Sequence, residues 1–202
     1  MNRLLKTGGA LMFLAGVITL MGIITAEIFY PPGYSTSQNE ISDLGATRPP
    51  NSVIVQPSAI IFNATMMAAG GLIIAASYFI QRVHQSLFVS GSVLLLGVGM
   101  LGVGVFPGNN ASIHPLCALL TFVGAGLAAI ASSRVTDSPF RLFAVVLGGT
   151  TLLFLVLAFF FGKVVFPVLG DGGTERWIAY PAVLWITGFG GYLLAGSKSE
   201  YA

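Results

Sequence analysis

Residues 87–106 read Leu-Phe-Val-Ser-Gly-Ser-Val-Leu-Leu-Leu-Gly-Val-Gly-Met-Leu-Gly-Val-Gly-Val-Phe, a run of 20 residues without a charged side chain. A transmembrane helix needs about 20 predominantly apolar residues, so this stretch is long enough to cross a bilayer. Five further stretches share its length and apolar character. The six predicted spans are approximately 8–30, 58–80, 87–106, 113–132, 140–161 and 177–195.

The composition of the whole chain is that of a membrane protein. Of its 202 residues, 55% are hydrophobic and only 8% are charged, and the mean hydropathy is +0.87. Soluble domains carry about 25% charged residues. Because the six spans use most of the chain, we predict one domain, residues 1–202. Its predicted fold is all-α: a six-transmembrane-helix up-down bundle with two longer outer loops.

Composition also restricts the partners and the chemistry. A formal charge of +2 gives no indication of nucleic-acid binding, whereas the apolar spans make membrane lipids the expected partners. The single cysteine, Cys117, lies within a predicted span and excludes a disulfide framework or a cysteine zinc site.

The basic residues predict the orientation in the membrane. With the N-terminus inside, six of them lie on the cytoplasmic side and three on the outer side, which favours cytoplasmic N- and C-termini in the plasma membrane. Arg3 and Lys6 precede the first apolar run as in a signal peptide, but the run is long enough to span, so we expect an uncleaved helix. The outer segments 31–57 and 162–176 are long enough to fold over the mouth of the bundle.

The first outer segment contains the sequence Asn39-Glu40-Ile41-Ser42-Asp43-Leu44-Gly45, which gathers polar groups in an otherwise apolar chain. Ser37 and Glu40 have the spacing of a capping box, and Gly45 is a typical helix stop. We therefore predict a short helix of about two turns with Glu40 and Asp43 on one face. An acid late in a helix opposes the helix dipole, so we expect Asp43 to meet Arg48, Arg176 or a metal ion.

Two further ionisable residues lie at the predicted outer rim. Glu27 is about one turn before Tyr30, where it either pairs with Lys163 or Arg176 or forms a pocket wall or proton-bearing group. His114 opens the fourth span, next to a proline. It is either a hydrogen-bonded residue of the helix start or a ligand.

The second outer segment leads into the sixth span through Gly170-Asp171-Gly172-Gly173-Thr174-Glu175-Arg176-Trp177. Thr174 or Asp171 is a candidate cap for the sixth helix. Arg176 with Trp177 and Tyr180 has the composition of an anchored rim, in which the arginine would hold an anionic head group and the aromatic rings would lie at the interface.

These residues, in this order, resemble a large family of six-span prokaryotic membrane proteins known only as a domain of unknown function. The likeness covers nearly the whole chain, and the sequence 39–45 is its most specific part. The resemblance implies a six-helix bundle and brings no established activity. Its other residues are Tyr34, Asn63, Phe106-Pro107, His114, Glu175-Arg176, Tyr180-Pro181 and Trp185.

Two classes of function fit these features. The first is a protein that binds or moves a lipid or other amphiphile at an outward-facing polar site. Arg176 and Arg48 would then hold the head group. The candidate ligand-binding residues are Glu27, Asn39, Glu40, Asp43, His114, Glu175, Arg176, Trp177 and Tyr180.

The alternative is a membrane-embedded, metal-dependent lipid hydrolase or transferase. Glu40, Asp43 and His114 would bind a divalent metal that activates water. Membrane hydrolases of the alkaline ceramidase type use three histidines, whereas this chain offers one plausible histidine, which weighs against a zinc amidase. A third possibility is that Asp43 pairs with Arg176 and Glu40 caps its own helix, in which case the polar cluster holds the outer loops together.

Overall fold

The computed structural model describes residues 3–165 and 167–196, and within these residues the chain is entirely helical apart from its loops. The elements are α1 (Arg3–Ile28), the short 3-10 helix η1 (Ile41–Leu44), α2 (Ser58–His84), α3 (Leu87–Val105), α4 (His114–Ser132), α5 (Phe140–Val165) and α6 (Gly170–Ala195). Each of the six α-helices is long and apolar enough to cross a membrane. The all-α, six-helix prediction is therefore confirmed.

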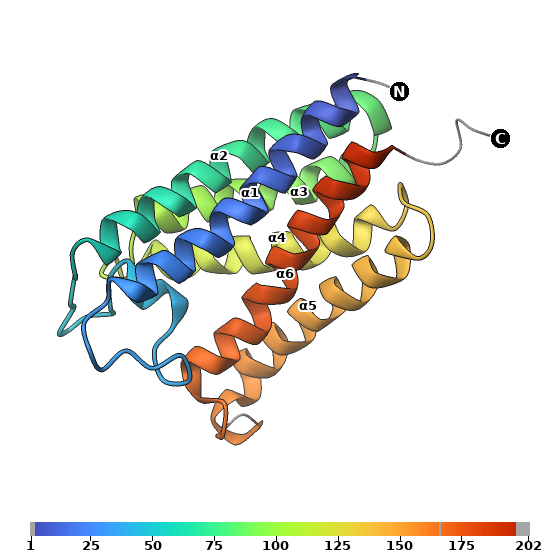
Figure 1. Ribbon diagram of the computed structural model, residues 1–202. Helices are drawn as coiled ribbons and strands as arrows, with labels where there is room; N and C mark the ends of the chain where they lie inside the picture. Colours follow the sequence, from blue (N-terminus) through green and yellow to red (C-terminus); the bar gives the residue numbers. More distant parts are fainter. Residues whose placement is uncertain (1–2, 166, 197–202) are drawn as a thin grey trace.

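The helices form a closed bundle in which neighbours in sequence are also neighbours in space (Figure 1). α1 packs against both α2 and α6, so the first and last helices close the ring. α6 also touches α4, which leaves α5 at the side of the bundle, in contact with α4 and α6. Only 17% of the apolar part of α5 is buried. The start of α1 and the end of α6 lie at the same end of the bundle.

The opposite end, where α2, α4 and α6 begin, is called the loop end below. There, the segment between α1 and α2 folds over the bundle and inserts two apolar side chains into its mouth. Ile41 and Leu44 of η1 are buried among the ends of α1, α2 and α6. The polar sequence 39–45 thus contributes to the hydrophobic core.

The predicted two-turn helix at this sequence is wrong, because the structure has a single 3-10 turn. The predicted Ser37–Glu40 capping box is also wrong. Glu40 is itself the N-cap, and Asp43 completes the box by accepting a hydrogen bond from the Glu40 backbone N–H at 3.0 Å. Ser37 instead pairs its hydroxyl with that of Ser35. Gly45 does end the turn, and its lack of a side chain leaves room for the amide of Asn63 on α2.

α6 begins at Gly170, seven residues before the predicted start at 177. Glycine disfavours helix, so the Gly-rich sequence there is typical of a loop. Packing overrides this preference, because the backbone of residues 36–39 lies directly on the first turn of α6. The Gly173 N–H donates to the Ser37 carbonyl at 3.1 Å. Neither Thr174 nor Asp171 caps the helix, since its N-cap position is Leu169.

Candidate functional site

The guanidinium group of Arg176 on α6 connects this helix to the end of α1 and to the loop that follows α1. Only 8% of the residue is exposed. Its Nη2 donates to Glu27 Oε1 on α1 at 2.6 Å and to the Tyr34 hydroxyl at 2.8 Å. The Tyr34 hydroxyl in turn donates to the Glu40 carbonyl at 3.1 Å. We call Arg176, Glu27 and Tyr34 the clamp.

The other terminal nitrogen of Arg176 binds backbone carbonyls of this loop and of the first turn of α6. Nη1 donates to the carbonyls of Thr36, Asn39 and Gly172 at 2.8, 2.9 and 3.0 Å. The pairing of Glu27 with Arg176, one of the two predicted alternatives, is confirmed; the side chain of Lys163, the other, lies outside the described residues. Because Arg176 faces a carboxylate and backbone carbonyls, its terminal nitrogens have no donor directed at an open cleft.

Glu40 and Asp43 have separate partners. Arg48 Nη2 lies 2.7 and 2.6 Å from the two carboxylate oxygens of Glu40, and the Arg48 side chain is 67% exposed. Burial raises the pKa of the Glu40 carboxyl above its ordinary value; Arg48 opposes this shift. Asp43 accepts from the Glu40 backbone and, at 3.5 Å, from the Asn39 amide. The expected cation is not among its partners in the described part of the chain.

A cavity of about 500 Å³ opens at the loop end between the η1 loop and the ends of α4, α5 and α6. We call it the vestibule. α4 contributes Ala118 and Phe122 to its wall, and α5 contributes Ala158. Its ionisable lining residues are Glu40, Arg48, His114, Asp171 and Glu175.

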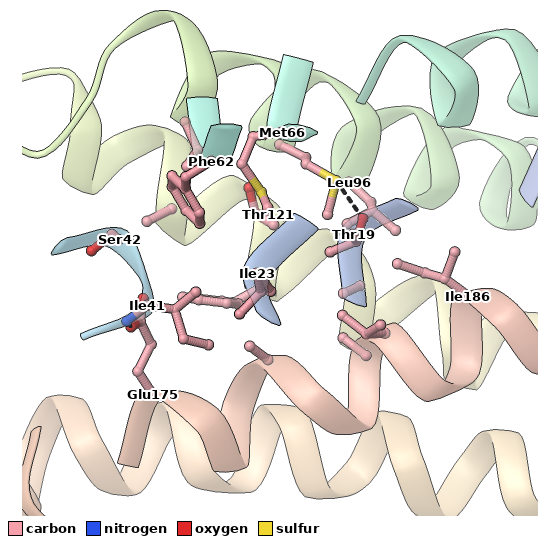
Figure 2. A pocket seen from close by; sticks show the side chains of 18 of the residues that line it. Thr19, Ile23, Ile41, Ser42, Phe62, Met66, Leu96, Thr121, Glu175 and Ile186 are labelled. Atoms are coloured by element: carbon pink, nitrogen blue, oxygen red, sulfur yellow. Dashed lines mark hydrogen bonds between the residues drawn. The ribbon is translucent and has the colours of Figure 1, made fainter. Parts of the chain in front are cut away.

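A second, smaller cavity of about 60 Å³ lies deeper in the bundle, and we call it the inner chamber (Figure 2). Its lining is almost wholly apolar, with Ile23, Phe62, Met66, Leu96 and Ile186 supplied by α1, α2, α3 and α6. Apolar cavities of this kind stay dry and accept apolar guests. The inner chamber and the vestibule share a wall made of Ser42, His114, Ala118, Phe122 and Glu175.

Glu175 occupies this shared wall and reaches from α6 toward η1, as Figure 2 shows. One of its carboxylate oxygens, Oε2, accepts a hydrogen bond from the Ile41 backbone N–H. The residue is half-buried. Among the residues that the structure describes, the other oxygen has no hydrogen-bond partner. Glu175 therefore fixes the position of the plug formed by Ile41 and keeps an acceptor free.

His114 is 4% exposed and borders both cavities. Its Nδ1 lies 2.8 Å from the Phe106 carbonyl oxygen. A carbonyl can only accept, so we assign the proton of the neutral ring to Nδ1 and leave Nε2 as an acceptor. Within residues 3–165 and 167–196, no group donates to Nε2. His114 thus ties the start of α4 to the end of α3 and keeps one acceptor on the cavity wall.

The structure does not bring Glu40, Asp43 and His114, the metal ligands predicted from the sequence, together at one point. In the described ranges, no three His, Cys, Asp or Glu side chains are grouped so that they could hold one metal ion. Glu40 and His114 both line the vestibule, whereas Asp43 turns back to cap η1. The geometry therefore brings Glu40, His114 and Glu175 to one cavity without making them a coordination sphere.

Trp177 and Tyr180 lie on a different face of α6. With Arg176 they border a surface hollow of about 500 Å³ near Pro181 and Leu184. Trp177 is 49% exposed and stacks on Phe154 of α5, with 5.0 Å between the ring centroids. The two aromatic residues thus lie in the first half of α6, away from the vestibule; their place at a membrane interface stays a prediction.

Some lining residues of the vestibule were not predicted as part of a site. The sequence indicates only a capping role for Asp171, whereas the structure places it in the first turn of α6, on the vestibule. Ala118, Phe122 and Ala158 are ordinary apolar residues of transmembrane helices, and nothing in their local sequence marks them. Their place in the wall follows from the packing of α4 beside α5, which the sequence does not specify.

The fold and the site define a multi-pass helical membrane protein with a two-part cavity at one end. The chain belongs to a protein family of unknown function, DUF998, whose family model matches residues 13–192. The predicted resemblance to an uncharacterised family is therefore confirmed. No curated protein and no solved structure matches the chain.

Proposed function

We propose that the protein binds an amphiphilic molecule at the loop end, with the polar group in the vestibule and the apolar chain directed toward the inner chamber. The observation that carries this proposal is the shared wall, which joins a cavity lined by ionisable groups to one lined by apolar side chains. Ligand sites are typically apolar hollows with a few placed polar groups. A lipid or a detergent-like molecule has that same division.

The position of α5 supports entry of the amphiphile into the vestibule from the side of the bundle. Among the described residues, the main helix contacts of α5 are with α4 and α6, and α5 supplies one wall of the vestibule. An apolar chain can therefore pass between α4 and α5 without disturbing the ring formed by the other five helices. We leave the clamp out of the binding site, because the terminal nitrogens of Arg176 already donate to Glu27, to Tyr34 and to backbone carbonyls of the loop and of α6.

Ala118→Phe tests the proposal, because Ala118 belongs to the wall between the two cavities. A phenyl ring at this position would fill the space between the vestibule and the inner chamber. We therefore expect dodecanol to bind at least about tenfold more weakly to the variant than to the wild type. Native mass spectrometry of the protein in a maltoside detergent measures the bound fraction. The matched control is Leu119→Phe, one residue along α4, where the side chain is 44% exposed on the outside of the bundle. Equal dodecanol binding by all three proteins would contradict the proposal.

The proposed orientation places the loop end outside the cell and both termini in the cytoplasm of a prokaryotic cell, following the distribution of basic residues. Asn51→Cys lies in the exposed loop before α2, and Ser138→Cys lies in the exposed turn before α5. In intact cells, a membrane-impermeant maleimide should label Asn51→Cys and leave Ser138→Cys unlabelled until the cells are opened. The reverse pattern would place the vestibule on the cytoplasmic side. The native Cys117 is buried and should give little background.

A further inference from the structure

The vestibule contains more negative than positive charge. Arg48 is the only basic side chain among its described lining residues, and it is paired with both oxygens of Glu40. This ion pair leaves the carboxylates of Asp171 and Glu175 without a cation among the described side chains. An anionic group entering the vestibule would therefore meet two carboxyl groups and, among the described side chains, no cation available to pair with it.

The ionisable groups of the cavity also supply hydrogen-bond acceptors, while Gln38 and Ser42 add an amide and a hydroxyl to its lining. His114, which is more than nine-tenths buried, keeps Nε2 on the wall as an acceptor without a donor. Within the described part of the chain, one carboxylate oxygen of Glu175 and both of Asp171 have no hydrogen-bond partner. Thr174, the nearest hydroxyl on α6, already donates to the Gly170 carbonyl at 2.7 Å. A ligand that carries N–H or O–H donors can therefore pair with these acceptors.

We infer that the polar group received by the vestibule is a protonated amine, carried by a molecule with an apolar chain. An ammonium group supplies three N–H donors and a positive charge, which match the free acceptors and the uncompensated carboxylates. The inference rests on the proposed function, since it names the chemical class of the amphiphile bound at the same site.

The arrangement of the acceptors also favours an ammonium group over a metal ion as the ligand. A small cation requires at least three ligands that converge on one point, and no such group is present in the described ranges. An ammonium group attached to a larger molecule needs one or two direct hydrogen bonds, because the apolar chain supplies further binding energy and the remaining carboxylate acts through its field.

The test compares three probes of equal chain length at pH 7: dodecylamine, dodecanol and dodecanoate. Native mass spectrometry of the wild type in a maltoside detergent should give dodecylamine an affinity at least about tenfold higher than dodecanol, with dodecanoate the weakest. Glu175→Gln removes the charge but can still accept from Ile41, and Asp171→Asn changes an exposed residue, so both should fold. Each should lower the dodecylamine affinity severalfold more than it lowers the dodecanol affinity.

Asp137→Asn is the matched control, because it removes the same charge at the opposite end of the bundle, and it should have no effect on either probe. For each probe, the affinity of the wild type is divided by that of the variant, so that partitioning of the probe into the micelle cancels. If dodecanol binds and is blocked by Ala118→Phe but dodecylamine shows no preference, the amine inference fails while the proposed function stands. If none of the probes binds, both fail.

A second arm identifies the source of the amine. Lysophosphatidylethanolamine carries a primary ammonium in a phospholipid head group, whereas lysophosphatidylcholine carries a quaternary ammonium that cannot donate. Preferential binding of the former supports the inference and points to a lipid head group. Binding of dodecylamine without either lysolipid supports it and points to a free long-chain amine. Equal binding of both lysolipids, together with equal binding of dodecylamine and dodecanol, would overturn it.

Discussion

Arg176→Ala should lower the stability of the protein more than any other single change at the loop end, by about 3 kcal/mol. The substitution leaves the Glu27 carboxylate without its cation, and it removes the donor shared by the carbonyls of Thr36 and Asn39. Removing one partner of a buried ion pair is costly because the other charge stays uncompensated. In a chain of this length, the loss corresponds to a fall of roughly 6–12 °C in the apparent Tm.

Thermal unfolding in detergent measures this loss, and limited proteolysis should show faster cleavage in the segment 31–40, which the clamp holds. Arg48→Ala is the matched control. Its ion pair with Glu40 is largely exposed on the arginine side, and exposed pairs contribute about 1 kcal/mol or less. If both arginine variants lose the same small amount, the clamp does not hold the loop in the way described.

Gly172→Ala should be strongly destabilising, although alanine is the better helix former. A Cβ on Gly172 would overlap the Asn39 carbonyl oxygen and would lie 2.8 Å from the Thr36 carbonyl oxygen. Both obstacles are backbone atoms, so relief requires the loop to move away from α6. Overpacking of this kind costs about 1–3 kcal/mol, and here it would also weaken the hydrogen bonds of Arg176 to those two carbonyls.

The control for this prediction is Gly149→Ala on α5, where a Cβ would meet no atom within 4 Å. That substitution should be neutral or should stabilise the helix by about 0.5–1 kcal/mol. The apparent Tm should therefore fall for Gly172→Ala and should stay the same or rise for Gly149→Ala. A Gly172→Ala protein as stable as the wild type would mean that the loop does not rest on α6.

The sequence was sufficient to predict the helices because each span carries its own signal. Residues 87–106, for example, are apolar over a length that matches a bilayer, and this requires no knowledge of their neighbours. The start of α6 could not be predicted in the same way. Its Gly-Asp-Gly-Gly sequence is locally unfavourable for helix, and only the contact with residues 36–39 makes the helical conformation favourable.

The candidate site was predictable in its membership but not in its pairings. The acids and His114 stand out because charge is rare in this chain, and most of them do lie at the loop end. Which groups meet depends on contacts between residues 134 positions apart, as for Ile41 and Glu175, or 149 positions apart, as for Glu27 and Arg176. The position of Asp43 in the 39–45 sequence predicts a metal or another cation as its partner. In the structure, its carboxylate instead accepts a hydrogen bond from the backbone of its own turn.

The clamp joins the end of the first helix to the beginning of the last, and this has a consequence for biosynthesis. A chain is made from its N-terminus, and its early segments are inserted in the membrane before the later ones exist. Glu27 and Tyr34 therefore lack their partner Arg176 until α6 has been synthesised. Until then, the loop over the mouth of the bundle is not held by the clamp. The guanidinium of Arg176 then completes both the ring of helices and its cover in one step. A truncated or stalled chain would expose an unpaired carboxylate and an unsecured loop, which are features that quality-control proteases can recognise.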